Sequence, residues 1–222
     1  MAALATPPSL PSNLRQTHAI CAACLNVHRA DADHTSACLF RQASITLTAS
    51  GWNSGITEAL RTDLRATSPR ATLLWVRVFR ILLSPHLTNT GVAIVPVPMS
   101  NSLGSMDLAF VARQVAEELS VAVLEVLQRR KRSSTRASVA QRREAIVREE
   151  YSIIESQAGK LIGQRVMLLD DVVTTGHTVT GLARMLKAAG ARQVLPVVLD
   201  RTVSPRLLQR LSVRAPDHCP HR

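Results

Sequence analysis

The stretch that most constrains the fold of this chain is residues 166–178, V-M-L-L-D-D-V-V-T-T-G-H-T. A short apolar run that ends at two adjacent carboxylates predicts a buried parallel strand with a polar site at its end. Thr178 is then expected to be the N-cap of a helix that stops at Gly190. The apolar face of this helix follows one-face spacing and comprises Val179, Leu182, Ala183 and Leu186.

The loop between this strand and this helix has the groups that bind a phosphorylated sugar. Together with the N–H groups at the start of the helix, three hydroxyls form an anion site, those of Thr174, Thr175 and Thr178. Gly176 lets the backbone come close to the anion. The acid pair, Asp170 and Asp171, can accept from the vicinal hydroxyls of a ribose and hold a hydrated Mg²⁺. The pattern predicts a ribose 5-phosphate site. The alternative is a buried strand with an acidic end that binds nothing.

Composition and charge indicate a globular protein with one main domain and an extension. Of the 222 residues 46% are hydrophobic and 19% are charged, and the net charge is +11. So positive a surface is expected to attract anionic partners, and nucleic acid is one possible partner. The alternative is that the charged side chains serve solubility and contact no partner. The start of the chain has Pro7, Pro8 and Pro11 and no secretory pattern, and no apolar run is long enough to cross a membrane. We therefore expect a cytoplasmic protein.

The cysteines allow two interpretations. Cys21 and Cys24 have the spacing of a zinc knuckle, which Cys38 with His28 or His34 could complete. The same cysteines suit buried free thiols, because Cys packs as a small hydrophobe. Four cysteines in a chain of this length do not form a disulfide scaffold.

Strands and helices alternate along the chain, which predicts an α/β fold with a mostly parallel sheet flanked by helices. We expect a flexible tail over residues 1–13, an extension or hood over 14–90, a core over 91–203 and a second tail over 204–222. Expected strands cover 91–99, 121–127, 151–154 and 193–199, and expected helices cover 58–64, 72–83 and the stretch that Asp107 caps. Ala71–Leu83 reads as a buried helix with a charged stripe at Arg77 and Arg80.

The stretch from Gln128 to Arg148 has seven Arg and one Lys against one Glu. Its guanidinium groups suit a diphosphate, because Arg donates two hydrogen bonds to phosphate oxygens. A solvated charged segment is the alternative. The stretch lacks the aromatic residues on which single-stranded nucleic acid would stack.

Residues 166–178 resemble the signature of the type I phosphoribosyltransferases, which use 5-phosphoribosyl 1-diphosphate (PRPP). The resemblance implies that the acid pair is catalytic and binds ribose and Mg²⁺. It also implies that the 5-phosphate lies on Val173, Thr174, Thr175, Gly176, His177 and Thr178. The implied reaction transfers the phosphoribosyl group to a nitrogen of a nucleobase or an amine and releases diphosphate. Transferases of this type commonly pair, so a homodimer is expected.

The layout of the chain is similar to the ComF-like branch of these enzymes, named after a bacterial competence protein. C-A-A-C at 21–24, I-V-P-V-P at 94–98 and Arg143, Val147 and Tyr151 follow the order of that branch. Where the branch has a basic patch after V-P-V-P, this chain has L-G-S-M at 103–106 and keeps only the glycine.

Two groups of residues are candidates for binding the diphosphate. The first is the loop with Ser100, Asn101, Ser102 and Gly104, and the second is Arg129, Arg130, Lys131 and Arg132. The departure at 103–106 leaves a second function open, a regulatory or competence-related protein that binds PRPP without turnover and contacts DNA through its basic face.

Overall fold

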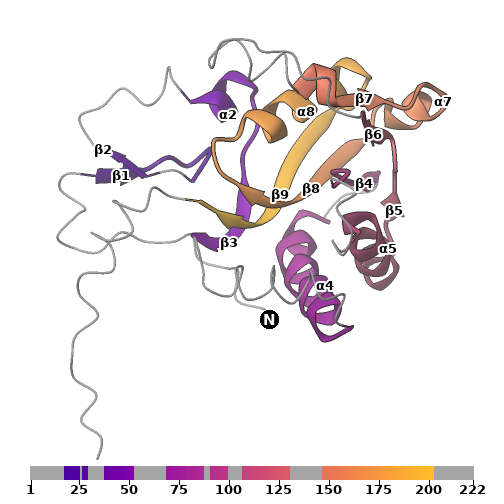
Figure 1. Ribbon diagram of the computed structural model, residues 1–222, viewed down its shortest axis with the longest axis horizontal. Coiled ribbons are helices and arrows are strands. Elements are labelled where there is room, and N and C mark those ends of the chain that lie inside the picture. The colour runs from indigo at the N-terminus through magenta and orange to yellow at the C-terminus, as the bar shows by residue number, and fades with distance from the viewer. Residues whose placement is uncertain are drawn as a thin grey trace, which may run out of the picture.

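Five parallel strands form the centre of the fold, in the spatial order β3-β9-β8-β4-β5 (Figure 1). The strands are β3 (Thr48–Trp52), β4 (Val92–Pro96), β5 (Ala122–Val123), β8 (Arg165–Val173) and β9 (Gln193–Arg201). Helix α5 (Leu108–Leu119) connects β4 to β5, and α8 (His177–Ala188) connects β8 to β9. The mostly parallel α/β sheet expected from the sequence is confirmed.

The computed structural model describes residues 18–25, 27–29, 38–52, 69–87, 91–99, 107–130 and 147–202. Several predictions lie outside these residues: both tails, the helix at 58–64, the loop at 100–106 and most of the Arg-rich stretch, including Lys131 and Arg132. Both β3 and α4 (Pro69–Leu83) belong to the expected extension at 14–90, yet β3 pairs with β9 in the central sheet. The sheet therefore draws strands from both sides of residue 91.

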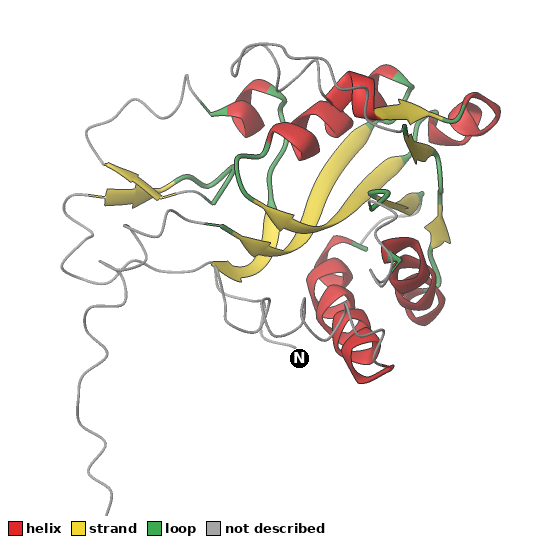
Figure 2. Ribbon diagram, in the orientation of Figure 1, coloured by secondary structure: helices red, strands yellow, loops and turns green. Residues whose placement is uncertain are grey.

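Helices cover both faces of the sheet (Figure 2). Helices α4 and α5 lie on one face, and α8 with the short α2 (Leu39–Gln42) lies on the other. Residues of β8 alternate between the two layers, because successive side chains of a strand point to opposite faces. Val166 and Leu168 pack toward α8, and Met167 and Leu169 pack toward α4 and α5.

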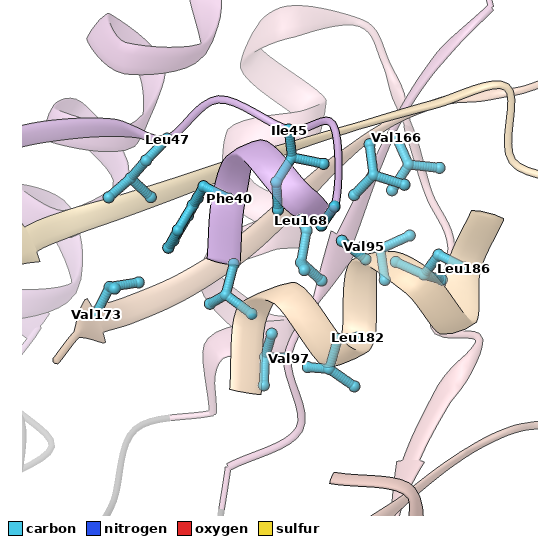
Figure 3. Close-up of a cluster of buried hydrophobic side chains, with 14 of the residues drawn as sticks. Phe40, Ile45, Leu47, Val95, Val97, Val166, Leu168, Val173, Leu182 and Leu186 are labelled. Atoms are coloured by element: carbon cyan, nitrogen blue, oxygen red, sulfur yellow. The ribbon is translucent and has the colours of Figure 1, made fainter. Parts of the chain in front are cut away.

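The layer around α8 joins the start of the chain to the sheet (Figure 3). Phe40 and Ile45 lie among side chains of β4, β8 and α8, including Val95, Leu168 and Leu182. Lys187 of α8 donates hydrogen bonds from Nζ to the carbonyl oxygens of Ala43 (2.9 Å) and Ser44 (3.0 Å), which follow α2. Both packing and hydrogen bonds therefore fix α2 on α8.

Two small antiparallel sheets complete the described fold. One consists of β1 (His18–Ile20) and β2 (Val27–Arg29), and the other of β6 (Leu127–Arg129) and β7 (Tyr151–Ile153). The remaining short elements are η1 (Ser84–His86), α7 (Glu155–Ala158) and η2 (Gly159–Leu161). The single strand expected at 121–127 is wrong in extent: β5 pairs with β4, whereas β6 leaves the sheet and pairs with β7.

Helix α4 is less buried than its sequence indicates. Trp75 and Phe79 are buried against the sheet with ring centroids 5.7 Å apart, and Arg77 and Arg80 are exposed as expected. Leu73, Leu74 and Ile81 are also exposed, so the expectation of a helix that is buried apart from its arginines is wrong. One face of the helix packs on the sheet, and the opposite face is exposed to solvent. None of the described helices has the length and apolar character needed to cross a membrane.

Candidate functional site

The candidate site lies where β8 ends and α8 begins. Gly176 is the N-cap of α8 with φ of 88°, so the prediction that Thr178 caps this helix is wrong. Thr178 is instead the second helical residue and is exposed. Glycine adopts a positive φ without steric cost, and this allows the chain to turn sharply from the strand into the helix. Two hydrogen bonds close the other end of α8 around Gly190, from its own N–H to Lys187 O and from Ala191 N–H to Leu186 O.

The acid pair occupies the carboxyl-terminal part of β8. Both side chains are half-buried, and each accepts a hydrogen bond from the next backbone N–H: Asp171 N–H to Asp170 Oδ1 at 2.9 Å, and Val172 N–H to Asp171 Oδ1 at 2.7 Å. These donors offset part of the repulsion between adjacent carboxylates. Half-buried carboxylates at a strand end are hard oxygen ligands of the kind that Mg²⁺ takes, so the acid pair fits this ion.

The threonine-rich loop, residues 174–178, presents donors to solvent. Thr174 and Thr175 are exposed, and their backbone N–H groups have no hydrogen-bond acceptor among the described residues. The first N–H groups of α8 add further donors and the positive end of the helix dipole. Thr175 Oγ1 lies 2.9 Å from Nδ1 of His177, which places this ring beside the loop. A phosphate at this position would find several donors within one turn of chain.

The small β6–β7 sheet lies beside the acid pair. Burial raises the pKa of Tyr151 on β7, the charge of Arg129 opposes this shift, and Asp170 and Asp171 add to it. Arg129 lies over the Tyr151 ring, with Cζ 5.6 Å from the ring centroid, and its Nη2 is 3.6 Å from Glu150 Oε2. Arg130 donates from Nε to Ser152 Oγ at 3.2 Å. Two of the four basic candidates are therefore described: Arg129 is the last residue of β6, and Arg130 follows it. Glu150 next to β7 pairs with Arg129, and Ser152 of β7 accepts from Arg130.

Two residues under the loop were missed by the sequence analysis as parts of the site. Arg201, at the end of β9, is 4% exposed and donates from Nη1 to the carbonyl oxygens of Val173 (3.2 Å) and Thr174. Phe40 of α2 packs so closely on Gly176 that a Cβ at that glycine would lie 2.4 Å from its Cε2. One feature of the sequence could have indicated Arg201. This residue lies at the end of the strand that follows α8, and the carboxyl ends of parallel strands meet at the edge of the sheet where ligands bind. Nothing local marked Phe40.

Three cysteines from two segments of the chain meet in the fold. In this cysteine cluster, Cys21, Cys24 and Cys38 are buried and are not disulfide-bonded, and their Sγ atoms lie within 4.8 Å of one another. The Sγ atoms of Cys21 and Cys38 are 3.7 Å apart. Thiolates on a tetrahedral Zn²⁺ at ~2.3 Å are separated by ~3.8 Å, so the cluster fits three ligands of zinc. The side chains of His28 and His34, the candidates for a fourth ligand, lie outside what the structure describes.

The surroundings of Cys21 stabilise its thiolate form. Burial by itself raises the pKa of Cys21, but hydrogen bonds from the backbone N–H groups of Cys24 and Ala23 and from the Arg41 side chain lower it to about 7. The thiolate is the form of cysteine that binds a metal. The electrostatics of the cluster therefore agree with its geometry.

Comparison with known proteins finds a protein family that is similar to this strand, loop and helix. The family model of the phosphoribosyl transferase domain matches residues 104–208, which include β8, the threonine-rich loop, α8 and β9. This stretch, which is less than half of the chain, is therefore similar to the phosphoribosyl transferase domain, in agreement with the resemblance of residues 166–178.

Among curated relatives, a ribose-phosphate pyrophosphokinase of Nostoc sp. is 30% identical over 101 residues, which make up 46% of this chain and 26% of that protein. The chain thus spans about a quarter of the length of this relative.

Solved structures that are similar to part of the chain include the following two. The glutamine PRPP amidotransferase of B. subtilis has a TM-score of 0.42 at 19% identity, over 58% of this chain and 26% of that one. The adenine phosphoribosyltransferase of Saccharomyces cerevisiae has a TM-score of 0.41 at 14% identity, over 65% of this chain and 75% of that one. No functional property is carried over from likenesses of this size.

Proposed function

We propose that this protein is a PRPP-binding phosphoribosyltransferase that transfers the 5-phosphoribosyl group to a nitrogen of a nucleobase or an amine. The observation that carries the proposal is the direct succession of two groups of atoms. The half-buried acid pair lies near the end of β8. The loop that follows presents threonine hydroxyls and backbone N–H groups that have no acceptor among the described residues, at the start of α8. A ribose diol and its 5-phosphate need these two kinds of partner side by side.

In the proposed reaction the acceptor nitrogen attacks the anomeric carbon with its lone pair. The bond from this carbon to the diphosphate oxygen breaks, and diphosphate leaves with the electron pair while the nitrogen loses its proton to solvent. Asp170 and Asp171 hold the ribose by its O2 and O3 hydroxyls, and residues 173–178 hold the 5-phosphate. Orientation of two bound partners supplies much of the rate, so no covalent intermediate with the protein is needed.

Mg²⁺ held at the acid pair would supply positive charge for the leaving diphosphate. The basic groups of this chain that we propose for the same anion are Arg129 and Arg130 with Lys131 and Arg132, together with the main chain at Ser100, Asn101, Ser102 and Gly104. Zn²⁺ in the cysteine cluster would have a structural role, because all three thiols are buried.

Diphosphate release tests this function. Protein, PRPP and Mg²⁺ are incubated with a panel of nucleobases and with ammonia, and diphosphate is measured against time. We expect release that depends on one acceptor, with an equal amount of phosphoribosylated product. Release that is the same with every acceptor and with none would indicate hydrolysis and contradict the transferase.

One observation in the sequence favours a second function. Residues 103–106 read L-G-S-M and offer no basic side chain to a diphosphate. A regulatory protein of the ComF-like branch that binds PRPP without turnover would need the site for the sugar phosphate. It would not need the basic side chains that stabilise diphosphate as it leaves. Tight PRPP binding without any release, together with DNA binding that weakens steeply with salt, is the result expected for this alternative. A cytoplasmic location and a homodimer are parts of both proposals.

A further inference from the structure

Helices α4 and α5 carry most of the large hydrophobic side chains that are exposed in the described part of the chain. Four such side chains lie on these two helices and are between 42% and 51% exposed: Leu73, Leu74, Ile81 and Phe110. Single exposed apolar residues are normal, whereas a group of them on one surface marks a place that another molecule covers. The two helices pack side by side on one face of the sheet, so their outer sides adjoin (Figure 1).

The outer side of α4 combines apolar residues with a positive charge. Leu74, Arg77 and Ile81 follow one another at a spacing of three and four residues, which places them on one face of the helix. Trp75 and Phe79 are buried on the other face, against the sheet. The exposed face of α4 is therefore opposite its core face.

The outer side of α5 combines an apolar residue with a negative charge. Phe110 and Glu117 are exposed and lie about two helical turns apart, so they share a face. Val111 and Val115 are buried on the opposite face. We call the exposed residues of both helices the α4–α5 face, which comprises Leu74, Arg77, Ile81, Phe110 and Glu117.

The two charged residues of the α4–α5 face are opposite in sign. Neither Arg77 nor Glu117 has an ion-pair partner in the part of the chain that the structure describes. The other charged side chains described on these helices are paired within the chain, as Arg80 is with Glu118 and Arg113 with Asp107 and Glu125. One positive and one negative charge therefore remain for a partner.

The charge of the chain favours a second copy as this partner. The net charge is +11, so two copies repel each other across most of their surfaces. On α4, on α5 and at the N-cap of α5, the described charged side chains are three arginines and three acids, so this surface is close to neutral. Nucleic acid would gain little here, because the surface has no excess of positive charge to offer its phosphates.

A two-fold axis along the helices would bring the two charges together twice. Arg80 Nε lies 3.4 Å from Glu118 Oε2, so the carboxyl-terminal ends of α4 and α5 lie side by side. Arg77 lies one turn before Arg80, and Glu117 is next to Glu118, so both charges are at nearly the same height. In a two-fold contact, each residue pair occurs twice. When α4 of one copy lies over α5 of the other, opposite charges meet and the apolar residues meet beside them.

We propose that the α4–α5 face binds the same face of a second copy of this chain, with Arg77 of each copy opposite Glu117 of the other. The inference assigns a surface to the homodimer that is part of the proposed function, and it rests on that part alone. No residue of the α4–α5 face belongs to the candidate site at the end of β8. The test of the dimer and the test of diphosphate release can therefore fail independently.

Charge reversal in the full chain tests the pairing. Sedimentation equilibrium over a series of protein concentrations gives the dissociation constant of the dimer. We expect wild type to dimerise, and Arg77→Glu and Glu117→Arg each to weaken the dimer at least about tenfold, because each change places like charges opposite one another at two positions. Leu74→Ser, which removes apolar contact without a change of charge, should weaken it as well. Arg192→Glu changes the net charge as Arg77→Glu does, at an exposed position just before β9, and should not weaken the dimer.

Mixing the two charge variants identifies the partner. In a heterodimer of Arg77→Glu with Glu117→Arg, opposite charges meet again at both positions. Native mass spectrometry distinguishes this heterodimer from either homodimer, because the two variants differ in mass. We expect the heterodimer to be the main dimer in the mixture, with a dissociation constant within about threefold of that of wild type. Circular dichroism of each variant should match wild type, since every substituted side chain is exposed.

The outcomes separate the ways in which the inference can fail. A wild type that stays monomeric at every concentration would overturn it and leave the α4–α5 face to a different protein. A dimer of unchanged strength in Arg77→Glu and Glu117→Arg would also overturn it, because the copies would then meet through another surface. A mixture that forms no heterodimer would refute the pairing of Arg77 with Glu117. Absence of PRPP binding in a wild type that dimerises through these residues would remove the proposed transferase and support the interface.

Discussion

At the scale of single residues, Gly176 carries a constraint that its neighbours in the loop do not. Its φ of 88° is a conformation that side-chain-bearing residues rarely adopt, and its α-carbon faces the ring of Phe40 at contact distance. Both conditions follow from the sharp change of direction between β8 and α8. The residue therefore links the shape of the candidate site to the packing of α2.

Replacing this glycine tests that link. Gly176→Ala should destabilise the fold by about 2–4 kcal/mol, the sum of a left-handed backbone and an overpacked contact. Denaturant unfolding gives the value. Gly159→Ala is the matched control, since a Cβ there meets nothing within 4 Å. The double variant with Phe40→Leu should cost less than the sum of its two single changes, and strict additivity would refute the contact.

The sequence indicates the candidate site residues, but it does not indicate the residues that support them. Asp170 to Thr175 could be proposed as candidates because the strand, the carboxylates and the threonines are contiguous in the sequence. Arg201 and Phe40 contact the loop from β9 and α2. Contacts between residues so far apart in the sequence produce no local sequence pattern, so they could not be predicted. The three cysteines are an intermediate case: C-A-A-C is a local signal, but only the fold brings Cys38 to it.

At the scale of elements, α2 depends on its neighbours, because a helix of four residues has little stability of its own. Packing of Phe40 and the two hydrogen bonds from Lys187 are its main supports. The strand β3 is tied in a different way, by its ladder to β9 and by Thr48 Oγ1, which lies 3.3 Å from His86 Nε2 on η1.

Removing the support of α2 should loosen the segment and not the sheet. Lys187→Met should lower the free energy of unfolding by about 1–2 kcal/mol, because two carbonyls lose a charged donor. Hydrogen exchange should rise at residues 39–47 and stay unchanged in β8. Lys160→Met, at an exposed position in η2, is expected to change neither quantity. Equal exchange at 39–47 in both variants would contradict the role of Lys187.

His86 should make stability depend on pH on the acid side. Burial and then the charge of Arg165 lower its pKa from the ordinary 6.5. As pH falls below about 6.5, the unfolded chain binds a proton there that the folded chain does not, so stability falls with pH. His86→Gln should lose less stability than wild type between pH 7 and pH 5 in denaturant titrations. Parallel losses in the two proteins would show that this histidine does not contribute.

At the scale of the whole molecule, the sheet brings together parts that lie far apart in the chain. The carboxyl end of β8 supplies the acid pair, the start of α8 the loop, β9 the buried arginine and the residues around α2 the cysteine cluster. The excess of positive charge, +11 over 222 residues, attracts anionic ligands to any such site and gives no preference among them. In the proposed function, selectivity for a ribose phosphate comes from the acid pair, which repels an anion that has no diol to donate to it.

The affinity for PRPP of an acid-pair variant tests this account most directly. Calorimetry with Mg²⁺ present should show that wild type binds PRPP and that Asp170→Asn/Asp171→Asn binds it at least about tenfold more weakly. The control is Glu117→Gln/Glu118→Gln, which removes two adjacent carboxylates from the end of α5 that is remote from the loop and should bind PRPP as wild type does. An unchanged affinity in the acid-pair variant, or no binding of PRPP by wild type, would contradict the site proposed for this protein.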